Sequence, residues 1–333
     1  MRFVLHALAL NGGDELFRFI DRLVDRAADE VHRIEVPDAD LLQSSGWYEG
    51  ARPTRRKILT SAVAVPPRRH TTDPGPHAKQ LEVCDIDSAR LADKLAHTPL
   101  TILVEDREAD GILLEILVEE LGSPELRSLW ACGQAVTPRA IEFENSTGIG
   151  AMPERVNRAV SDAKIEGRPP RYFVLCDSDA RWPGDSGPSN RAIAKLRQTC
   201  VDASIPLHVL QKRNAENYIP DTVIEAVRDD PNNITNIHRF NALLRRTPVQ
   251  RDHFPVKDGL SDVERTDAVT TGLYKPHEEA DLLLLKERLF PKRPRLLMRL
   301  HGERRTDFTG PGFLARDGSG EIGSLLDAIA KEL

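Results

Sequence analysis

The pattern of apolar and polar residues predicts short buried strands that alternate with amphipathic helices in the middle of the chain. Apolar runs of four or five residues bounded by polar residues are typical of parallel strands buried on both faces. Such runs occur at 101–104, 140–145, 172–176 and 206–210, and helical patterns at 111–121, 153–164 and 190–203 follow the first three. This order of elements favours an α/β fold with a parallel sheet flanked by helices.

The segments on either side predict two further regions. Residues 2–10 are expected to form a strand, and residues 14–28 and 87–97 amphipathic helices, so the chain should begin as an α/β extension. Pro, Gly, Ser and Arg accumulate between about 37 and 77, which indicates a long mobile insertion. Helical patterns dominate after residue 220, at 221–228, 237–246, 278–289 and 322–333. We therefore expect an N-terminal region (1–98), a central domain (99–228) and a mostly helical C-terminal region (229–333).

Carboxylates follow two of the predicted strands. Glu105 ends the first strand of the central domain, and Asp177 and Asp179 end the third. Parallel sheets bind ligands outside the carboxyl ends of their strands, so these acids should share one rim. If Asp177-Ser178-Asp179 is extended, its two carboxylates point the same way. Such oxygens suit Mg²⁺ or Mn²⁺, although strand ends and helix caps are also rich in acids for purely structural reasons.

Residues 100–225 resemble the Toprim domain, the metal-binding module shared by topoisomerases, primases, small ribonucleases and the overcoming-lysogenization-defect (OLD) nucleases. The resemblance is carried by Leu103-Val104-Glu105, by the turn with Gly148 and Gly150 after the second strand, and by Asp177-Ser178-Asp179. The string Lys212-Arg213-Asn214-Ala215-Glu216-Asn217-Tyr218-Ile219 is similar to the segment after the fourth strand in OLD-like, defence-associated members.

The resemblance implies a Rossmann-like Toprim sheet and a nuclease that uses Mg²⁺ or Mn²⁺. In this family pattern Glu105, Asp177 and Asp179 would bind a first metal ion. Many relatives carry an acid four positions after the glutamate, where this chain has Ala109. A second metal, or proton transfer, would therefore depend on other acids nearby, namely Glu108, Asp110 or Glu216.

A cation is also needed at the scissile phosphate. Lys212 and Arg213 are the candidates, because they follow the fourth strand at the same rim. The structural alternative is that both lie in a solvated turn. Glu216 could likewise be an ordinary acid in the first turn of a helix, where acids favour the helix dipole.

Local basic clusters matter more for nucleic-acid binding than the formal net charge of −6. One cluster lies at 52–57 and another between 292 and 305. From these, the residues expected to contact nucleic acid are Arg55, Arg56, Arg293, Arg295 and Arg299. Each cluster alone is more often a solvated or disordered face, and a positive groove is expected because the two clusters flank the predicted phosphate site.

Other features limit the setting in which the protein is expected to act. No apolar run approaches the length of a membrane span, and the four cysteines show no paired spacing, so we expect a cytoplasmic protein with reduced thiols. OLD-type enzymes usually pair their Toprim domain with an ATPase, and this sequence has no P-loop motif. The resemblance therefore implies a separately encoded ATPase or sensor as partner, and self-association stays open.

The sequence thus predicts a metal-dependent endonuclease that cleaves DNA or RNA. The resemblance further implies a toxic effector of prokaryotic antiviral defence. Two alternatives stay open: a non-catalytic Toprim-fold subunit that binds nucleic acid or a partner ATPase, and a phosphotransfer receiver-like domain. The receiver alternative leaves the segment Glu216-Asn217-Tyr218 unexplained.

Overall fold

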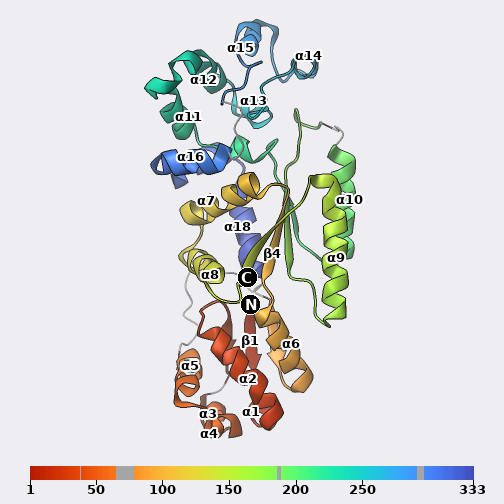
Figure 1. Ribbon diagram of the computed structural model, residues 1–333, viewed down its shortest axis with the longest axis vertical. Helices are drawn as coiled ribbons and strands as arrows, with labels where there is room; N and C mark the ends of the chain where they lie inside the picture. The colour runs from red at the N-terminus through yellow and green to blue at the C-terminus, as the bar shows by residue number, and fades with distance from the viewer. Residues whose placement is uncertain (38, 65–78, 186–188, 291–295) are drawn as a thin grey trace.

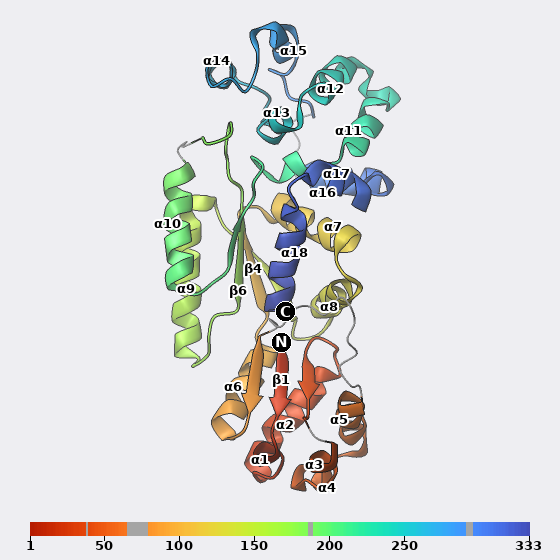
Figure 2. The same ribbon diagram turned by 180° about the vertical axis from the view of Figure 1, so that it is seen from behind.

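Two parallel sheets and a helical part follow one another along the long axis of the molecule (Figure 1). The computed structural model describes residues 1–333 except 38, 65–78, 186–188 and 291–295. The N- and C-termini lie side by side where the first sheet meets the second (Figures 1 and 2). There the amino group of Met1 donates a hydrogen bond to the carbonyl of Leu333.

The first sheet has the order β2-β1-β3, with all strands parallel. It consists of β1 (Arg2–Leu5), β2 (Arg33–Glu35) and β3 (Gln80–Val83). Helices α2 (Asp14–Ala27) and α6 (Ile86–His97) pack together beside it, as the sequence predicted. The expected strand 2–10 is too long, because the chain turns at His6 into the short helix α1 (Ala7–Leu10).

The predicted mobile insertion is wrong for residues 39–64. They form α3 (Ala39–Gln43), α4 (Gly46–Gly50) and α5 (Pro53–Ala64). Ser45 caps α4 by accepting a hydrogen bond from the Tyr48 amide. Trp47 is 1% exposed and its indole N–H donates to Asp21 at 3.0 Å. A buried tryptophan and a helix cap therefore order a segment whose composition suggested mobility; residues 65–78 lie outside the described part.

The second sheet has the order β5-β4-β6-β7 and is also parallel. Its strands are β4 (Leu100–Val104), β5 (Ile141–Asn145), β6 (Tyr172–Cys176) and β7 (Leu207–Val209), close to the predicted positions. Ile102 of β4 pairs with Phe143 on one side and Phe173 on the other. Since β4 and β6 are neighbours and parallel, the acids that follow them lie at one rim. The expected α/β class is confirmed.

Helices cover both faces of this sheet (Figures 1 and 2). On one face α9 (Met152–Ile165) and α10 (Ser189–Asp202) pack on a core that includes Leu103 and Val174. The other face carries α7 (Ile112–Leu121), α8 (Pro124–Ala135) and the C-terminal helix α18 (Glu321–Glu332).

The C-terminal part is mostly helical, as predicted, and most of it lies beyond the carboxyl ends of β4 and β6, while α18 returns along the sheet (Figure 1). Its apolar residues belong to the same core as one face of the second sheet, so the expected boundary at 228/229 does not separate two cores. In the described part of the chain, no helix is long and apolar enough to cross a membrane. The elements are α11 (Asp221–Arg228), η4 (Pro231–Asn236), α12 (Ile237–Leu244), α13 (Pro248–Asp252), α14 (Asp262–Thr270), η5 (Pro276–Glu278), α15 (Glu279–Leu284), α16 (Leu296–Arg304), η6 (Arg305–Asp307) and α17 (Gly310–Asp317).

Candidate functional site

Four carboxylates and one lysine gather beyond the ends of β4 and β6. We call them the acid cluster: Glu105, Asp110, Asp177, Glu216 and Lys257. Glu105 follows β4, Asp177 follows β6, and Lys257 comes from the loop between α13 and α14. Each carboxylate side chain of the cluster except Glu105 belongs to a residue that is less than 10% exposed. Charges from four regions distant in sequence are thus brought into one small volume.

The β4 side of the cluster is built by a tight turn. The side chain of Asp106 accepts a hydrogen bond from the Glu108 amide at 2.8 Å and starts the π-helical turn η1 (Arg107–Gly111). This turn carries Asp110 back to the strand end. Its Oδ2 accepts the amide hydrogens of Glu105 at 3.1 Å and Asp106 at 3.0 Å. The carboxylate of Asp110 is therefore fixed by backbone beside Glu105.

The β6 side is tied to the short helix η3 (Ala215–Tyr218). Oδ1 of Asp177 accepts the amide hydrogen of Ala215 at 3.1 Å, which places Glu216 next to Asp177. The side-chain amide of Asn217 donates to the carbonyls of Arg251 at 2.7 Å and Phe254 at 2.8 Å. This pair of hydrogen bonds holds the loop that carries Lys257, so the Glu-Asn-Tyr segment joins the sheet to the C-terminal helices.

Asp179 lies at the edge of the cluster, and its backbone is not extended as we expected. Strand β6 ends at Cys176, and Asp179 has a left-handed φ of 51°. Asp adopts this region more readily than most residues. The premise of an extended Asp-Ser-Asp segment is therefore wrong. The Asp179 carboxylate is exposed and accepts a hydrogen bond from Ser189 Oγ at 2.8 Å, yet its charge still acts on Glu105.

The glycine turn after β5 lies beside Glu105. Gly148 has a φ of 108°, which disfavours any residue with a Cβ. A Cβ built there would lie 3.9 Å from Oε1 of Glu105. The hydroxyl of Ser146 donates to the Gly148 carbonyl at 2.8 Å and fixes the turn. Beside Glu105 the cluster is thus bordered by the backbone of Gly148, which has no side chain.

Burial and mutual repulsion shift the protonation of these acids. Burial, with a contribution from the charge of Asp179, raises the pKa of Glu105 to about 6. Burial, together with the charges of Glu216 and Glu105, raises the pKa of Asp110 to about 7. For Asp177, burial and then the charge of Asp110 raise the pKa well above its usual range. Protons therefore bind these groups more tightly than they bind an exposed carboxylate, and a cation close to the acids opposes this shift.

Lys257 is the cation that compensates them. Its Nζ lies 2.9 Å from Oε1 of Glu216. Burial alone would lower the pKa of Lys257, but the charges of Glu216, Asp177 and Asp110 outweigh it and raise the pKa. Nothing in the local sequence Pro255-Val256-Lys257-Asp258 pointed to this role. Only the fold brings the lysine to the acids.

The donor chemistry of the cluster suits a divalent ion. Oε2 of Glu105 and Oε2 of Glu216 are buried without a hydrogen-bond partner among the described residues, and Oε1 of Glu216 has only the Lys257 ammonium. Hard cations prefer such carboxylate oxygens. Over the described residues, however, no three His, Cys, Asp or Glu side chains are already spaced as ligands of one ion. The oxygens fit the ion in kind, and binding it would require the side chains to close around it.

Lys212 and Arg213 do not face the acid cluster. Nζ of Lys212 donates to Oδ1 of Asp252 at 2.7 Å, and Arg316 contacts the same oxygen at 2.7 Å. The guanidinium of Arg213 donates to Glu264 at 2.7 Å. Both side chains turn toward the C-terminal helices instead, and a phosphate contact by either of them at the rim stays a prediction.

The remaining predicted site residues are Glu108 and five arginines. Glu108 is not among the carboxylates that chiefly raise the pKa values in the cluster. Arg55 forms ion pairs with Asp21 and Asp25, and Arg56 donates to the carbonyls of Ala51 and Glu49. Arg299 pairs with Glu303 at 3.4 Å. Arg293 and Arg295 fall outside the described residues, and a nucleic-acid contact by any of the five arginines stays a prediction.

Comparisons with known proteins add no relative to this picture. No family model, no curated protein and no solved structure matches the chain.

Proposed function

We propose that the protein is a divalent-metal-dependent nuclease that hydrolyses phosphodiester bonds of DNA or RNA at the acid cluster. The observation that carries this proposal is the convergence of four carboxylates at the adjoining ends of two parallel strands, with buried oxygens of Glu105 and Glu216 that lack hydrogen-bond partners. So many buried negative charges are costly to keep without a function. The Toprim-like sequence pattern includes three of the four carboxylates, namely Glu105, Asp177 and Glu216.

Each residue of the cluster has a defined task in this proposal. Glu105, Asp110, Asp177 and Glu216 would hold Mg²⁺ or Mn²⁺, and Asp179 lies at the exposed edge beside Glu105. When bound, the ion would neutralise phosphate charge and acidify a water molecule. Backbone amides donate hydrogen bonds to the carboxylates of Asp110 and Asp177. These two carboxylates are therefore held in place by the backbone. Lys257 would pair with the negative charge of the phosphate once the ion takes over its role among the acids.

One observation favours a second candidate, a non-catalytic Toprim-fold subunit that binds nucleic acid or a partner ATPase. Lys257 already compensates the acids, and no three of them have ligand spacing in the described part of the chain. A cluster that Lys257 holds permanently would be a structural ion-pair network. The two candidates differ in whether Mn²⁺ binds and whether substrate is cut.

The biological setting is also a proposal. The Toprim-like segment resembles defence-associated members, so we place the protein in prokaryotic antiviral defence, with a separately encoded ATPase or sensor as partner and possible self-association. All four cysteines are free, which is compatible with the reducing cytoplasm.

A cleavage assay tests the proposed activity. Purified protein is incubated with plasmid DNA and with single-stranded RNA, in EDTA and in Mg²⁺ or Mn²⁺. We expect cleavage only with the metal, and a loss on the order of a hundredfold or more in Glu105→Gln and Asp177→Asn. Glu154→Gln is the matched control, because the Glu154 side chain is 81% exposed on α9, outside the cluster. Equal cleavage by all variants would remove the acid cluster from the mechanism.

A further inference from the structure

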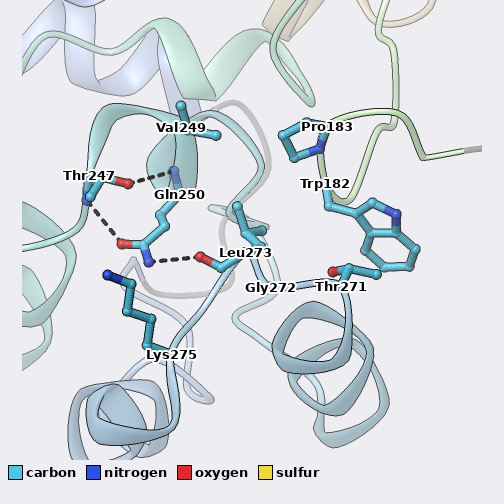
Figure 3. Close-up of a pocket in the computed structure, with 9 residues that line it drawn as sticks. All are labelled: Trp182, Pro183, Thr247, Val249, Gln250, Thr271, Gly272, Leu273 and Lys275. Atoms are coloured by element: carbon cyan, nitrogen blue, oxygen red, sulfur yellow. Dashed lines mark hydrogen bonds between the residues drawn. The ribbon is translucent and has the colours of Figure 1, made fainter.

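A cavity of about 550 Å³ lies between the loop after β6 and the helices α13 and α14. It is formed by Trp182, Pro183, Thr247, Val249, Gln250, Thr271, Gly272, Leu273 and Lys275 (Figure 3). Its volume falls in the range of small-molecule sites, and its lining combines apolar walls with a few polar groups. The cavity belongs to neither the acid cluster nor its ion pairs.

Trp182 forms one end of this cavity, and its indole is contacted by a residue that does not line the cavity. The guanidinium of Arg181 lies over the indole, 4.3 Å from the ring centroid, but Arg181 does not line the cavity. Arg181 is itself held by Asp185 at 2.9 Å. The indole is therefore kept in position on its outer side, while Trp182 contributes to the cavity wall.

The opposite wall is rigid and offers few polar groups of its own. Gln250 accepts the amide hydrogen of Thr247 at 3.0 Å and donates to the carbonyl of Leu273 at 2.9 Å (Figure 3). These bonds use the amide of Gln250 for the fold. Val249, which is 50% exposed, and Leu273 add apolar surface. The wall suits a flat, largely apolar ligand face.

Lys275 supplies a positive charge away from Trp182. Its side chain is drawn on the far side of Gln250 and Leu273 from the indole (Figure 3). Lys275 is exposed and makes no ion pair with the rest of the described chain. A ligand that stacks on Trp182 and carries a negative group would therefore meet a charge of opposite sign.

The cavity is close to the acid cluster along the chain. Trp182 is three residues after Asp179, which limits their Cα atoms to a separation of about 11 Å. The carbonyl of Ala180, between them, is fixed by a hydrogen bond with His253 Nδ1 at 2.8 Å. A nucleic-acid strand with one phosphate at the acid cluster would pass this loop.

We infer that the cavity binds a nucleobase of a single-stranded nucleic acid that flanks the phosphate at the acid cluster, with the base stacked on Trp182 and a neighbouring phosphate near Lys275. Aromatic side chains bind successive bases in this sequence-tolerant way. The inference rests on the proposed function for its substrate class. It adds a residue, Trp182, that positions the strand without touching the reacting atoms.

Two other cavities lack this combination of groups. The one near α2, of about 490 Å³, contains Phe19 among charged side chains, but Arg22 and Arg90 already lie over that ring, 5.0 and 5.9 Å from its centroid, and Arg55 is paired with Asp21. The one beside β7, of about 320 Å³, has no tryptophan, tyrosine or phenylalanine in its lining. The stacking surface and the free lysine occur together at the cavity of Trp182.

Intrinsic fluorescence can test binding without any cleavage. The chain has three tryptophans, and Trp47 and Trp130 are 1% and 6% exposed, so Trp182 is the one that a ligand can reach. The full chain in EDTA is titrated with uridine, with 5′-UMP, and with hexamers of uridylate and of thymidylate. We expect quenching by the nucleotides and tighter binding of the hexamers. If no probe changes the emission at millimolar concentration, the inference is overturned.

Variants separate stacking from charge. With a dye-labelled hexamer, Trp182→Ala should weaken binding by about five- to 150-fold, the range for loss of one base stack, whereas Trp182→Phe should restore most of the affinity. Lys275→Glu should weaken binding of 5′-UMP while leaving uridine nearly unchanged. Val263→Ala is the surface control, because Val263 is 70% exposed and does not line the cavity.

The outcomes distinguish this inference from the proposed nuclease activity. Base binding that depends on Trp182, in a protein that never cuts, would support the cavity and contradict the nuclease. Metal-dependent cleavage with unchanged hexamer binding and unchanged KM in Trp182→Ala would support the nuclease and overturn the cavity. Thermal melts of all variants show whether any loss comes from unfolding instead. If Trp182→Ala does not fold, Lys275→Glu keeps the test valid, because Lys275 is exposed and this variant should still weaken binding of 5′-UMP.

Discussion

The ammonium of Lys257 lies 2.9 Å from Oε1 of Glu216, whose side chain is only 1% exposed. Glu216 belongs to the segment after the second sheet, and Lys257 to the loop between α13 and α14. The C-terminal helices therefore supply the positive charge that compensates the acids at the sheet. A divalent ion and this lysine would compete for the same carboxylates.

Replacing Lys257 should expose the repulsion among the acids. At pH 8 without metal, Lys257→Met should lower the free energy of unfolding by roughly 1–3 kcal/mol, less than the 3–5 kcal/mol for a fully buried pair, because the Lys257 side chain is 41% exposed. Added Mn²⁺ should recover part of this loss. Denaturant unfolding with and without Mn²⁺ measures both effects.

Lys286→Met is the matched control, since Lys286 pairs with Asp262 at a site where both side chains are more than a third exposed. Its loss should be within about 1 kcal/mol, with no rescue by Mn²⁺. If Lys257→Met behaves like this control, the acids do not depend on the lysine.

The acid cluster should make the metal-free protein less stable as the pH rises. A carboxyl with a higher pKa in the folded than in the unfolded state binds its proton more tightly when folded, so stability falls as the pH rises through the interval between the two values. For Glu105 this interval runs from 4.5 to about 6. Glu105→Gln should therefore be more stable than wild type by about 1–2 kcal/mol at pH 8 and nearly equal to it at pH 4.

Urea unfolding in EDTA at several pH values checks this expectation, with Glu154→Gln alongside. A wild-type curve that does not fall between pH 4.5 and 7, or a destabilised Glu105→Gln at pH 8, would show that Glu105 is already well compensated.

Lys212 should matter for stability and not for chemistry. It shares Asp252 with Arg316: Nζ of Lys212 and the guanidinium of Arg316 each lie 2.7 Å from Oδ1 of Asp252. Lys212→Met should lower the free energy of unfolding by roughly 1–3 kcal/mol, while cleavage per folded molecule stays unchanged. A hundredfold loss of turnover in a well-folded Lys212→Met would show that Lys212 takes part in the cleavage reaction.

The strands and the acids that end them could be predicted from sequence because buried parallel strands leave an unmistakable apolar run. The runs before Glu105 and Asp177 predicted neighbouring strand ends, and the structure places both residues in one cluster. Asp110 and Glu216 were, with Glu108, the further acids that the resemblance implied for a second metal ion or for proton transfer.

What could not be predicted depends on contacts between distant segments. Lys257 reaches the acids only because Asn217 holds the preceding loop through two backbone carbonyls. Lys212 turns away because Asp252, forty residues later, accepts its hydrogen bond. The helices at 39–64 form because Trp47 is buried, which composition alone does not indicate. The left-handed φ of Asp179 likewise could not be predicted, and it interrupts the alternating side-chain directions that an extended chain would have.

Binding of Mn²⁺ to the purified protein, measured by calorimetry or electron paramagnetic resonance at pH 8, tests the central claim most directly. The account predicts that wild type binds Mn²⁺, that Glu105→Gln and Asp177→Asn weaken binding on the order of tenfold or more, that Lys257→Met strengthens it, and that Glu154→Gln leaves it unchanged. Absence of Mn²⁺ binding by wild type, or equal affinity in wild type, Glu105→Gln and Asp177→Asn, would contradict the assignment of the acid cluster as a metal site.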